Sequence, residues 1–251
     1  MRHFIALLIT VIGAANSTTA TELLDVPDMD SFGWQVFDEM GSSDMSLWDV
    51  QSYRAQVSRA SWTSPGGLYS RAYNTILTES GSGCYGKLIP ELSEKVYGIR
   101  ADLEYGFGYS TNQNSYNRSV LGVEVFPDSY FYFGLFDIGG TLKGTIASEE
   151  NGQLTLYEGS FDVSANTRYN LAIAFDEDEN TMWLYKDNQC LGYAIINPSG
   201  ASFDPFIESY SHYTRSWLSI DNVEVATIPE PATLVLISLG AVISRKRQHF
   251  V

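Results

Sequence analysis

Alternating apolar and polar residues recur through the middle of the chain. The clearest alternation covers residues 96–106, where one face carries Tyr97, Ile99, Ala101, Leu103 and Tyr105. The opposite face carries Arg100, Asp102 and Glu104. A period of two is that of a half-buried β-strand. The same period recurs in Leu121, Val123 and Val125, in Phe131, Phe133 and Leu135, and in Leu171, Ile173 and Phe175.

Turn residues arrange the later strands into a meander. Two apolar runs flank residues 176–180, and a third run follows Asp187, Asn188 and Gln189. This spacing predicts three antiparallel strands joined by tight turns. Near the end, the alternation through Leu218 and Ile220 shifts phase to Val223 and Val225. The one-residue shift predicts a β-bulge at Asp221 and Asn222.

The fold class follows from these strands. No segment of residues 21–226 shows a helical apolar stripe, and Gly, Tyr and Phe are abundant, at 21, 16 and 13 residues. Many short strands with glycine-rich turns predict an all-β domain of two antiparallel sheets packed face to face. Residues 21–226 are long enough for one such domain with a sizeable core. Aromatic residues scattered through residues 30–51 indicate an early strand and a loop that pack on the sandwich edge.

The N-terminus has the pattern of an export signal. Arg2 and His3 precede an apolar run over residues 4–15, and residues 16–20 are small and polar. This order is typical of a secretory signal peptide cut after Ala20. A retained N-terminal anchor is the alternative, although the run is shorter than the about 20 residues that a spanning helix needs. We expect an N-terminal signal helix outside the domain.

Export would expose Cys84 and Cys190 to an oxidising compartment. A disulfide between them would contribute roughly 4 kcal/mol in the loop-entropy model. Two free, buried thiols are the alternative, and the sequence leaves both open.

The C-terminus carries a second targeting pattern. Pro229, Glu230 and Pro231 interrupt regular structure, residues 232–243 are almost wholly apolar, and the basic cluster Arg245, Lys246 and Arg247 follows. The apolar segment is short for a permanent span, and basic residues hold the cytoplasmic end of a membrane segment. In this order the three parts over residues 228–248 resemble the PEP-CTERM sorting signal of bacterial envelope proteins, although four further residues follow the basic cluster. An ordinary C-terminal anchor is the alternative.

The resemblance implies several properties. An exosortase-type membrane protease would recognise Pro229, Glu230 and Pro231. A short apolar helix would hold the protein transiently in the inner membrane, and processing would then release it to the cell envelope, cell surface or extracellular matrix.

The strand pattern of the domain carries a second resemblance. The runs over residues 168–176 and 183–189, with the closing Ile220-Asp221-Asn222-Val223, resemble the second half of concanavalin A-like and laminin-G-like jelly rolls. The resemblance covers residues 119–226 loosely, and it implies a jelly-roll sandwich of the kind that binds carbohydrate.

Charge and missing motifs narrow the function. The chain has a formal net charge of −15, which disfavours nucleic acid and anionic lipid as partners. Outside the two terminal segments the only histidine is His212, which excludes an ordinary His/Cys metal site. No phosphate-binding loop or serine-nucleophile elbow occurs. Asp102 and Glu104 share a strand face beside Arg100, which favours a solvated charged face over an acid/base pair.

Two binding patterns remain. Tyr130, Tyr132, Trp183 and Tyr185 lie on the strand faces opposite the expected core, where aromatic rings can stack on sugar. The alternative is that these rings pack under loops or in the second sheet. Asp176, Asp178 and Asn180 offer oxygen ligands for calcium within one turn, with a solvated hairpin tip as the alternative.

The sequence therefore predicts an exported, non-catalytic, lectin-like sandwich that binds a glycan or polysaccharide or acts structurally, with no cofactor except a candidate calcium ion. The competing hypothesis is a glycan-active hydrolase of the concanavalin A-like fold with unrecognised carboxylates.

Overall fold

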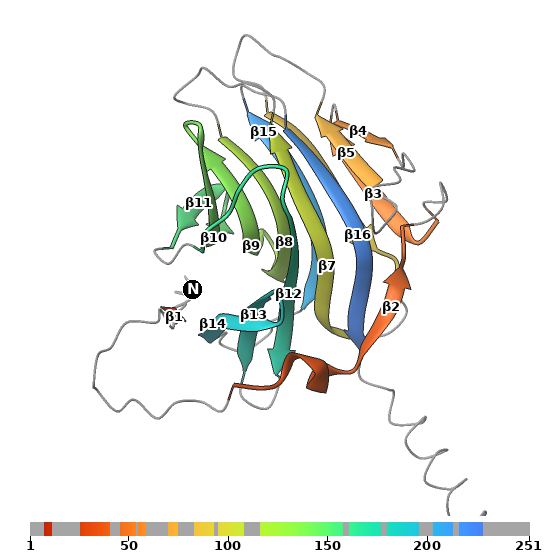
Figure 1. Ribbon diagram of the computed structural model, residues 1–251, viewed down its shortest axis with the longest axis vertical. Helices are drawn as coiled ribbons and strands as arrows, with labels where there is room; N and C mark the ends of the chain where they lie inside the picture. The colour runs from red at the N-terminus through yellow and green to blue at the C-terminus, as the bar shows by residue number, and fades with distance from the viewer. Residues whose placement is uncertain are drawn as a thin grey trace, which may run out of the picture.

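The structure is a computed structural model that describes residues 8–11, 26–40, 46–53, 55–58, 70–74, 83–92, 95–107, 116–157, 161–176, 180–195, 203–212 and 216–227. These residues form antiparallel strands and one short 3₁₀ helix, η1 (Met29–Phe32). Figure 1 shows the strands stacked in two curved layers. The predicted all-β class and two-sheet antiparallel sandwich are confirmed.

The first layer is a nine-stranded sheet. Its strands run in the order β1-β14-β13-β12-β7-β16-β5-β4, and β2 pairs with β16 beside β5. The strand bounds are β1 (Leu8–Val11), β2 (Trp34–Asp38), β4 (Ala55–Ser58), β5 (Ser70–Asn74), β7 (Val96–Phe107), β12 (Arg168–Asp176), β13 (Thr181–Lys186), β14 (Gln189–Ile195) and β16 (Ser216–Thr227).

The second layer is a seven-stranded sheet in the order β11-β10-β9-β8-β15-β6-β3. Its strands are β3 (Trp48–Tyr53), β6 (Gly83–Pro90), β8 (Tyr116–Phe126), β9 (Ser129–Ile138), β10 (Thr141–Glu150), β11 (Gln153–Leu156) and β15 (Asp204–His212). Consecutive strands β8 to β11 are joined as hairpins, whereas β15 returns from far along the chain to lie between β8 and β6.

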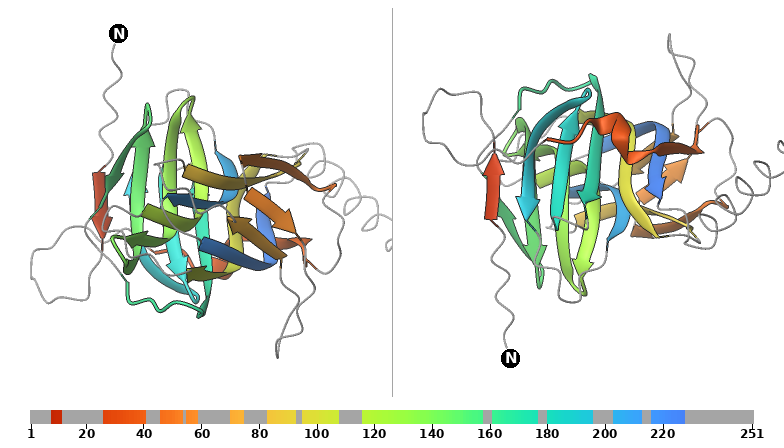
Figure 2. Two further views of the ribbon diagram at one scale, coloured as in Figure 1. Left: turned by 90° about the horizontal axis from the view of Figure 1, so that it is seen from above. Right: turned by 90° about the horizontal axis from the view of Figure 1, so that it is seen from below.

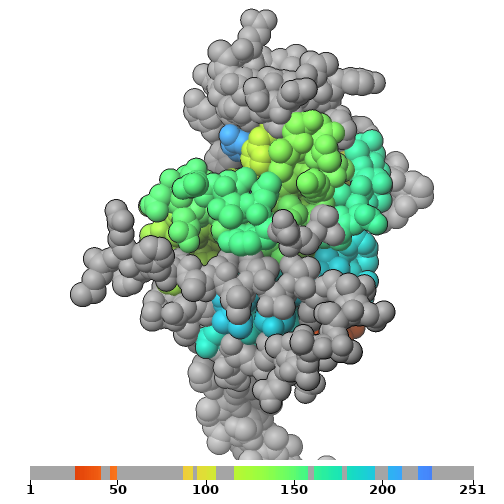
Figure 3. Space-filling model, turned by 90° about the vertical axis from the view of Figure 1, so that its left-hand side faces the viewer, coloured from red at the N-terminus to blue at the C-terminus, as the bar shows by residue number. Residues whose placement is uncertain are grey.

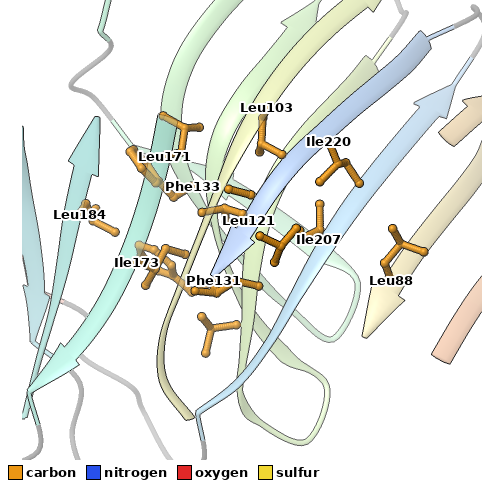
Figure 4. Packing of buried hydrophobic residues seen from close by; sticks show 14 of the residues in the cluster. Leu88, Leu103, Leu121, Phe131, Phe133, Leu171, Ile173, Leu184, Ile207 and Ile220 are labelled. Atoms are coloured by element: carbon orange, nitrogen blue, oxygen red, sulfur yellow. The ribbon is translucent and has the colours of Figure 1, made fainter. Parts of the chain in front are cut away.

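The main core lies between the two sheets. Figure 4 shows Leu103, Leu171, Ile173, Leu184 and Ile220 of the first sheet directed toward Leu88, Leu121, Phe131, Phe133 and Ile207 of the second. All ten side chains are at most 2% exposed. The alternation predicted for residues 96–106 is confirmed from Ile99 to Tyr105, where the apolar face is buried in this core and the polar face is half-buried. At the start of β7 the alternation differs, because Val96 belongs to the core cluster and the buried Tyr97 does not.

The meander and the bulge are also confirmed. β12, β13 and β14 pair antiparallel in sequence order. Asp187 and Asn188 both have positive φ, 49° and 66°, the conformation of a two-residue hairpin turn. In β16 the register shifts between Asp221 and Glu224, and Asn222 has φ 49°. The extra residue lets Ile220 and Val223 both face the core.

The outer face of the nine-stranded sheet is covered by the segment that the sequence placed at the sandwich edge. Met29 and Trp34 pack on this face with Ala172, Ala174 and Trp183. The right-hand view of Figure 2 shows the orange segment with η1 lying across the sheet. Gly98 permits this contact, since a Cβ there would lie 2.7 Å from the Trp34 ring.

The N-terminal apolar run differs from the expected signal helix. Leu8–Val11 form strand β1, paired with residues 192–195 of β14 at the edge of the nine-stranded sheet. The prediction of a helix is wrong for these four residues. Ile9, Thr10 and Val11 are β-branched, and they complete the backbone hydrogen bonds along an edge that is otherwise open.

The C-terminal pattern lies outside the described residues, including the apolar segment, Pro229, Glu230, Pro231, Arg245, Lys246 and Arg247. Within the described part of the chain, no helix has the length and apolar character needed to cross a membrane.

Candidate functional site

The hairpin of β10 and β11 forms a rigid corner of the seven-stranded sheet. Its two-residue turn, Asn151-Gly152, has positive φ at both positions, 51° and 77°, which matches the twist of the flanking strands. The Asn151 amide donates a hydrogen bond of 3.2 Å to the Asp128 carbonyl in the neighbouring β8–β9 turn. The hairpin tip is therefore fixed to the rest of the sheet.

The core-facing side of this hairpin changes from apolar to polar along β10. Ile146 belongs to the core, whereas the next residues on the same face are Ser148 and Glu150. They pair across the hairpin with Thr155 and Gln153. The polar end of the hairpin lines a hollow of about 280 Å³, bordered by Ser148, Glu150, Asn151, Gln153, Thr155 and Tyr157.

Tyr157 borders the hollow and is held at three atoms. Its amide donates to the Ile146 carbonyl at 3.0 Å, and its carbonyl accepts from the Thr145 hydroxyl at 3.0 Å. Its own hydroxyl lies 2.7 Å from the Ser148 hydroxyl. Figure 3 views the molecule from the side of this hairpin, whose residues are green. The hollow therefore combines a fixed aromatic ring with hydroxyl, amide and carboxylate groups.

The outer face of the seven-stranded sheet carries a second polar cluster, centred on Arg118. Its guanidinium forms ion pairs with Glu208 and, at 2.9 Å, with Glu149. It also donates to the Tyr132 hydroxyl at 3.0 Å, and that hydroxyl donates to Glu149 at 3.1 Å. Burial of the hydroxyl, with the charge of Glu208, raises the pKa of Tyr132 above its ordinary value. The two glutamates therefore face one guanidinium.

Aromatic rings continue this outer face toward β6. Tyr130 stacks on Tyr132, with ring centroids 6.2 Å apart, and Phe206 meets both rings edge to face. The Lys87 ammonium lies 3.8 Å from the Phe206 centroid and 4.8 Å from that of Tyr130. Burial lowers the pKa of Lys87, and the charge of Glu208 partly opposes that shift. Tyr130 is the only one of these rings that is not buried.

Comparison with known proteins identifies the fold and no family. No protein-family model and no curated protein sequence matches the chain. Among solved structures, an endo-β-galactosidase from Clostridium perfringens that releases GlcNAcα1-4Gal matches with a TM-score of 0.53 and 11% identity. The match covers 80% of this chain and 64% of that one. The two chains share a fold.

Two further solved structures match less well. A sialidase matches over 78% of this chain with a TM-score of 0.49 and 12% identity, and the carbohydrate-binding module CBM66 from Bacillus subtilis matches over 71% with a TM-score of 0.43 and 9% identity. The match covers 95% of the binding module, whereas it spans only 18% of the sialidase.

Three of the four predicted glycan-binding rings are buried. Tyr132, Trp183 and Tyr185 are 2%, 0% and 1% exposed, so none offers a ring face to a ligand. Trp183 and Tyr185 do lie opposite the main core, but the segment with η1 covers them, and the Tyr185 hydroxyl donates to the Pro27 carbonyl at 2.9 Å. Only Tyr130 keeps part of its ring accessible.

The acidic residues on β7 belong to a hydrogen-bonded network. Asp102 accepts from the Asn170 and Asn222 amides at 2.8 and 2.9 Å. Its cross-strand neighbour Asp221 accepts from Arg168 at 3.3 Å. Burial raises the pKa of Asp221, and the Asn222 amide and Arg168 partly oppose this shift. Glu104 takes no part in the contacts described for Asp102 and Asp221. It lies directly opposite Arg168 in the pairing of β7 with β12.

The remaining predicted sites are resolved only in part. Of the candidate calcium ligands, Asp176 and Asn180 flank the β12–β13 turn, and Asp178 lies outside the described residues. Cys190 is a free thiol, and it donates to the Gly192 carbonyl at 3.6 Å. It lies in the nine-stranded sheet, whereas Cys84 lies in β6 of the other sheet, so the candidate disulfide is not formed at Cys190. His212 ends β15, and its side chain lies outside the described ones.

The sequence did not single out the hollow, although a signal was present. Asn-Gly between two β-rich runs marks a two-residue hairpin. The change from Ile146 to Ser148 and Glu150 on one strand face marks where that face leaves the core. Arg118 was missed because its partners Glu149 and Glu208 come from strands far apart in sequence.

Proposed function

We propose that this chain is an exported cell-envelope protein whose sandwich, a jelly roll of the concanavalin A-like kind, binds a neutral glycan in the hollow beside the β10–β11 hairpin. The observation that carries the proposal is the lining of that hollow. It sets hydroxyl, amide and carboxylate groups beside the fixed ring of Tyr157.

These groups suit a sugar ring. Glycans present several hydroxyls that both donate and accept, so a site needs donors and acceptors in fixed positions, and an aromatic ring covers the apolar face of the sugar. Asn151 and Gln153 offer both donors and acceptors, and Glu150 accepts. The volume of about 280 Å³ lies near the lower end of ligand sites, about 300–1,000 Å³, which suits a short glycan segment.

Binding is favoured over hydrolysis by the contacts of the carboxylates. A glycosidase needs two carboxyl groups directed at one bond, about 5–10 Å apart. Glu149 and Glu208 are instead both engaged by Arg118, and Asp102 and Asp221 are engaged by Arg168 and neighbouring amides. The hollow contains one carboxylate, Glu150. A hydrolase with unrecognised carboxylates remains the competing function.

A glycan array with a reducing-sugar assay separates these functions. We expect the purified full-length protein to bind one class of neutral glycan without releasing reducing ends. Gln153→Ala and Tyr157→Ala should each weaken binding about tenfold or more, as loss of a hydrogen-bonding group and of a stacking ring would predict. Tyr130→Ala on the outer face is the matched control and should leave binding unchanged.

The two assays, run on these variants, distinguish glycan binding in the hollow, binding on the outer face, hydrolysis and a structural role. Binding that is lost in Tyr130→Ala but kept in Gln153→Ala would move the site to the outer face of the seven-stranded sheet. Release of reducing ends that disappears in Glu149→Gln or Glu208→Gln would establish the hydrolase. If the protein neither binds a glycan on the array nor releases reducing ends, a structural role is the remaining function.

Delivery to the envelope is proposed from the two terminal patterns. We expect the protein isolated from its own envelope to begin after Ala20 and to lack residues 244–251 when its termini are measured by mass spectrometry. A mature chain that retains residues 244–251 would replace exosortase sorting with an ordinary C-terminal anchor.

A further inference from the structure

Polar side chains occupy core-facing positions at one end of the sandwich. Asn117 and Ser119 precede Leu121 on the inward face of β8, Asp137 follows Leu135 on β9, and Ser209 follows Ile207 on β15. Asn117, Ser119 and Asp137 are 0% exposed, and Ser209 is 2% exposed. The apolar core therefore ends in a cluster of buried oxygens, which we term the oxygen cluster.

The members of the oxygen cluster are neighbours. Asn117 lies opposite Asp137 across the strand pair, and its amide nitrogen donates to Asp137 Oδ2 at 3.0 Å. Ser119 lies opposite Ser209 in the next strand pair. From the other sheet, the buried Tyr105 hydroxyl lies close enough to Asp137 and Asn117 for both to shift its pKa. The cluster thus joins three strands of one sheet and one strand of the other.

Four oxygens of this cluster lack a hydrogen-bond partner. They are Asp137 Oδ1, Asn117 Oδ1, Ser119 Oγ and Ser209 Oγ, and each is shielded from solvent. Buried polar atoms are almost always satisfied, and exceptions usually mark an ion, a water or a functional strain. Within the described residues, no basic side chain forms an ion pair with Asp137.

We infer that the oxygen cluster binds a hard cation, with calcium as its test ion. Every unsatisfied group is an oxygen, and oxygen-only donor sets suit calcium and other hard cations, whereas transition metals favour nitrogen and sulfur. A cation would offset the cost of burying a charged carboxylate at Asp137. A water molecule would satisfy the hydrogen bonds without supplying a positive charge.

The ligand set fits calcium better than magnesium. Calcium accepts about 6–8 oxygens in flexible geometry, whereas magnesium demands a near-ideal octahedron and usually keeps several waters. The four side-chain oxygens come from three neighbouring strands whose positions are set by sheet pairing and not by the ion, which favours the cation that tolerates irregular geometry. Main-chain carbonyls and water would complete it. This site is separate from the Asp176 turn and from the glycan hollow.

Calcium titration of the full-length protein tests the inference. After treatment with chelator, we expect calcium at one hundred times its Kd to raise the melting temperature by roughly 5–10 °C, through preferential binding to the folded state. Asp137→Asn should abolish this rise. Asp176→Asn, at the other candidate calcium site, is the matched control and should keep it.

A second, milder variant tests the site in case Asp137→Asn does not fold. Ser119→Ala removes one ligand and little volume, and it should weaken calcium binding about tenfold while the protein still unfolds cooperatively. Calorimetric titration should give one bound calcium per chain in the unmodified protein. Absence of any calcium response in the unmodified protein, or a full response in Asp137→Asn, would overturn the inference and assign the cluster to water.

Discussion

Replacing Gly122 by alanine tests the packing of the outer face of the seven-stranded sheet. A Cβ at this position would lie 2.2 Å from both Cε2 and Cζ of Phe206, well inside the about 3.5–4.0 Å separation of carbon atoms in contact. The ring has little room to move, because it is 1% exposed and meets Tyr130 and Tyr132 edge to face with the Lys87 ammonium over it. We expect a loss of about 1–3 kcal/mol of unfolding free energy from overpacking.

A double-mutant cycle isolates this contact. Phe206→Ala alone should cost about 3–5 kcal/mol because it empties a buried aromatic site. In that background the added methyl group enters the vacated space, so Gly122→Ala should cost nearly nothing. Urea denaturation monitored by circular dichroism should then give a coupling free energy of about 1–3 kcal/mol between the two positions. Additive effects, within about 0.5 kcal/mol, would show that the ring does not cross Gly122.

Three further changes test single groups. Burial raises the pKa of Asp221 above 3.8, so Asp221 binds its proton more tightly in the folded chain than in the unfolded one. Its contribution to the unfolding free energy therefore falls as the pH rises above 3.8 and through the folded-state pKa. Asp221→Asn should flatten this part of a plot of unfolding free energy against pH. Arg118→Met leaves the Glu208 carboxylate buried without its partner and should cost about 3–5 kcal/mol in urea denaturation, and a loss below 1 kcal/mol would contradict the ion pair. Gly152→Ala forces a side chain onto a residue with φ 77° and should lower the unfolding free energy by about 1–2 kcal/mol.

Local patterns predicted the core well, because a strand face repeats every two residues. Leu121, Phe133 and Ile173 were assigned to the core from alternation alone, and all three are fully buried. The bulge at Asn222 was also predictable, because a shift in the alternation of apolar and polar residues within one strand requires an extra residue. These features depend only on neighbours along the chain, which is why sequence suffices for them.

The opposite strand faces could not be predicted in the same way. Whether Trp183 and Tyr185 are open or covered depends on the segment with η1, about 150 residues earlier in the chain, and no local pattern links the two. The Arg118 ion pairs and the oxygen cluster have the same origin, since each combines strands from distant parts of the sequence. Buried polar residues on an inward face, such as Asn117 and Asp137, interrupt the alternation and were therefore not assigned to the core.

The segment Leu8–Val11 shows how one apolar run can satisfy two roles. Its residues are suited to a signal peptide, yet the same residues pair with β14 when they remain attached. The segment adds only four residues, at an edge of the nine-stranded sheet. Its removal would therefore expose the outer backbone groups of β14, while the pairing of β14 with β13 would remain. Because edge strands readily pair with added chains, occupancy of this edge before processing does not conflict with the proposed export.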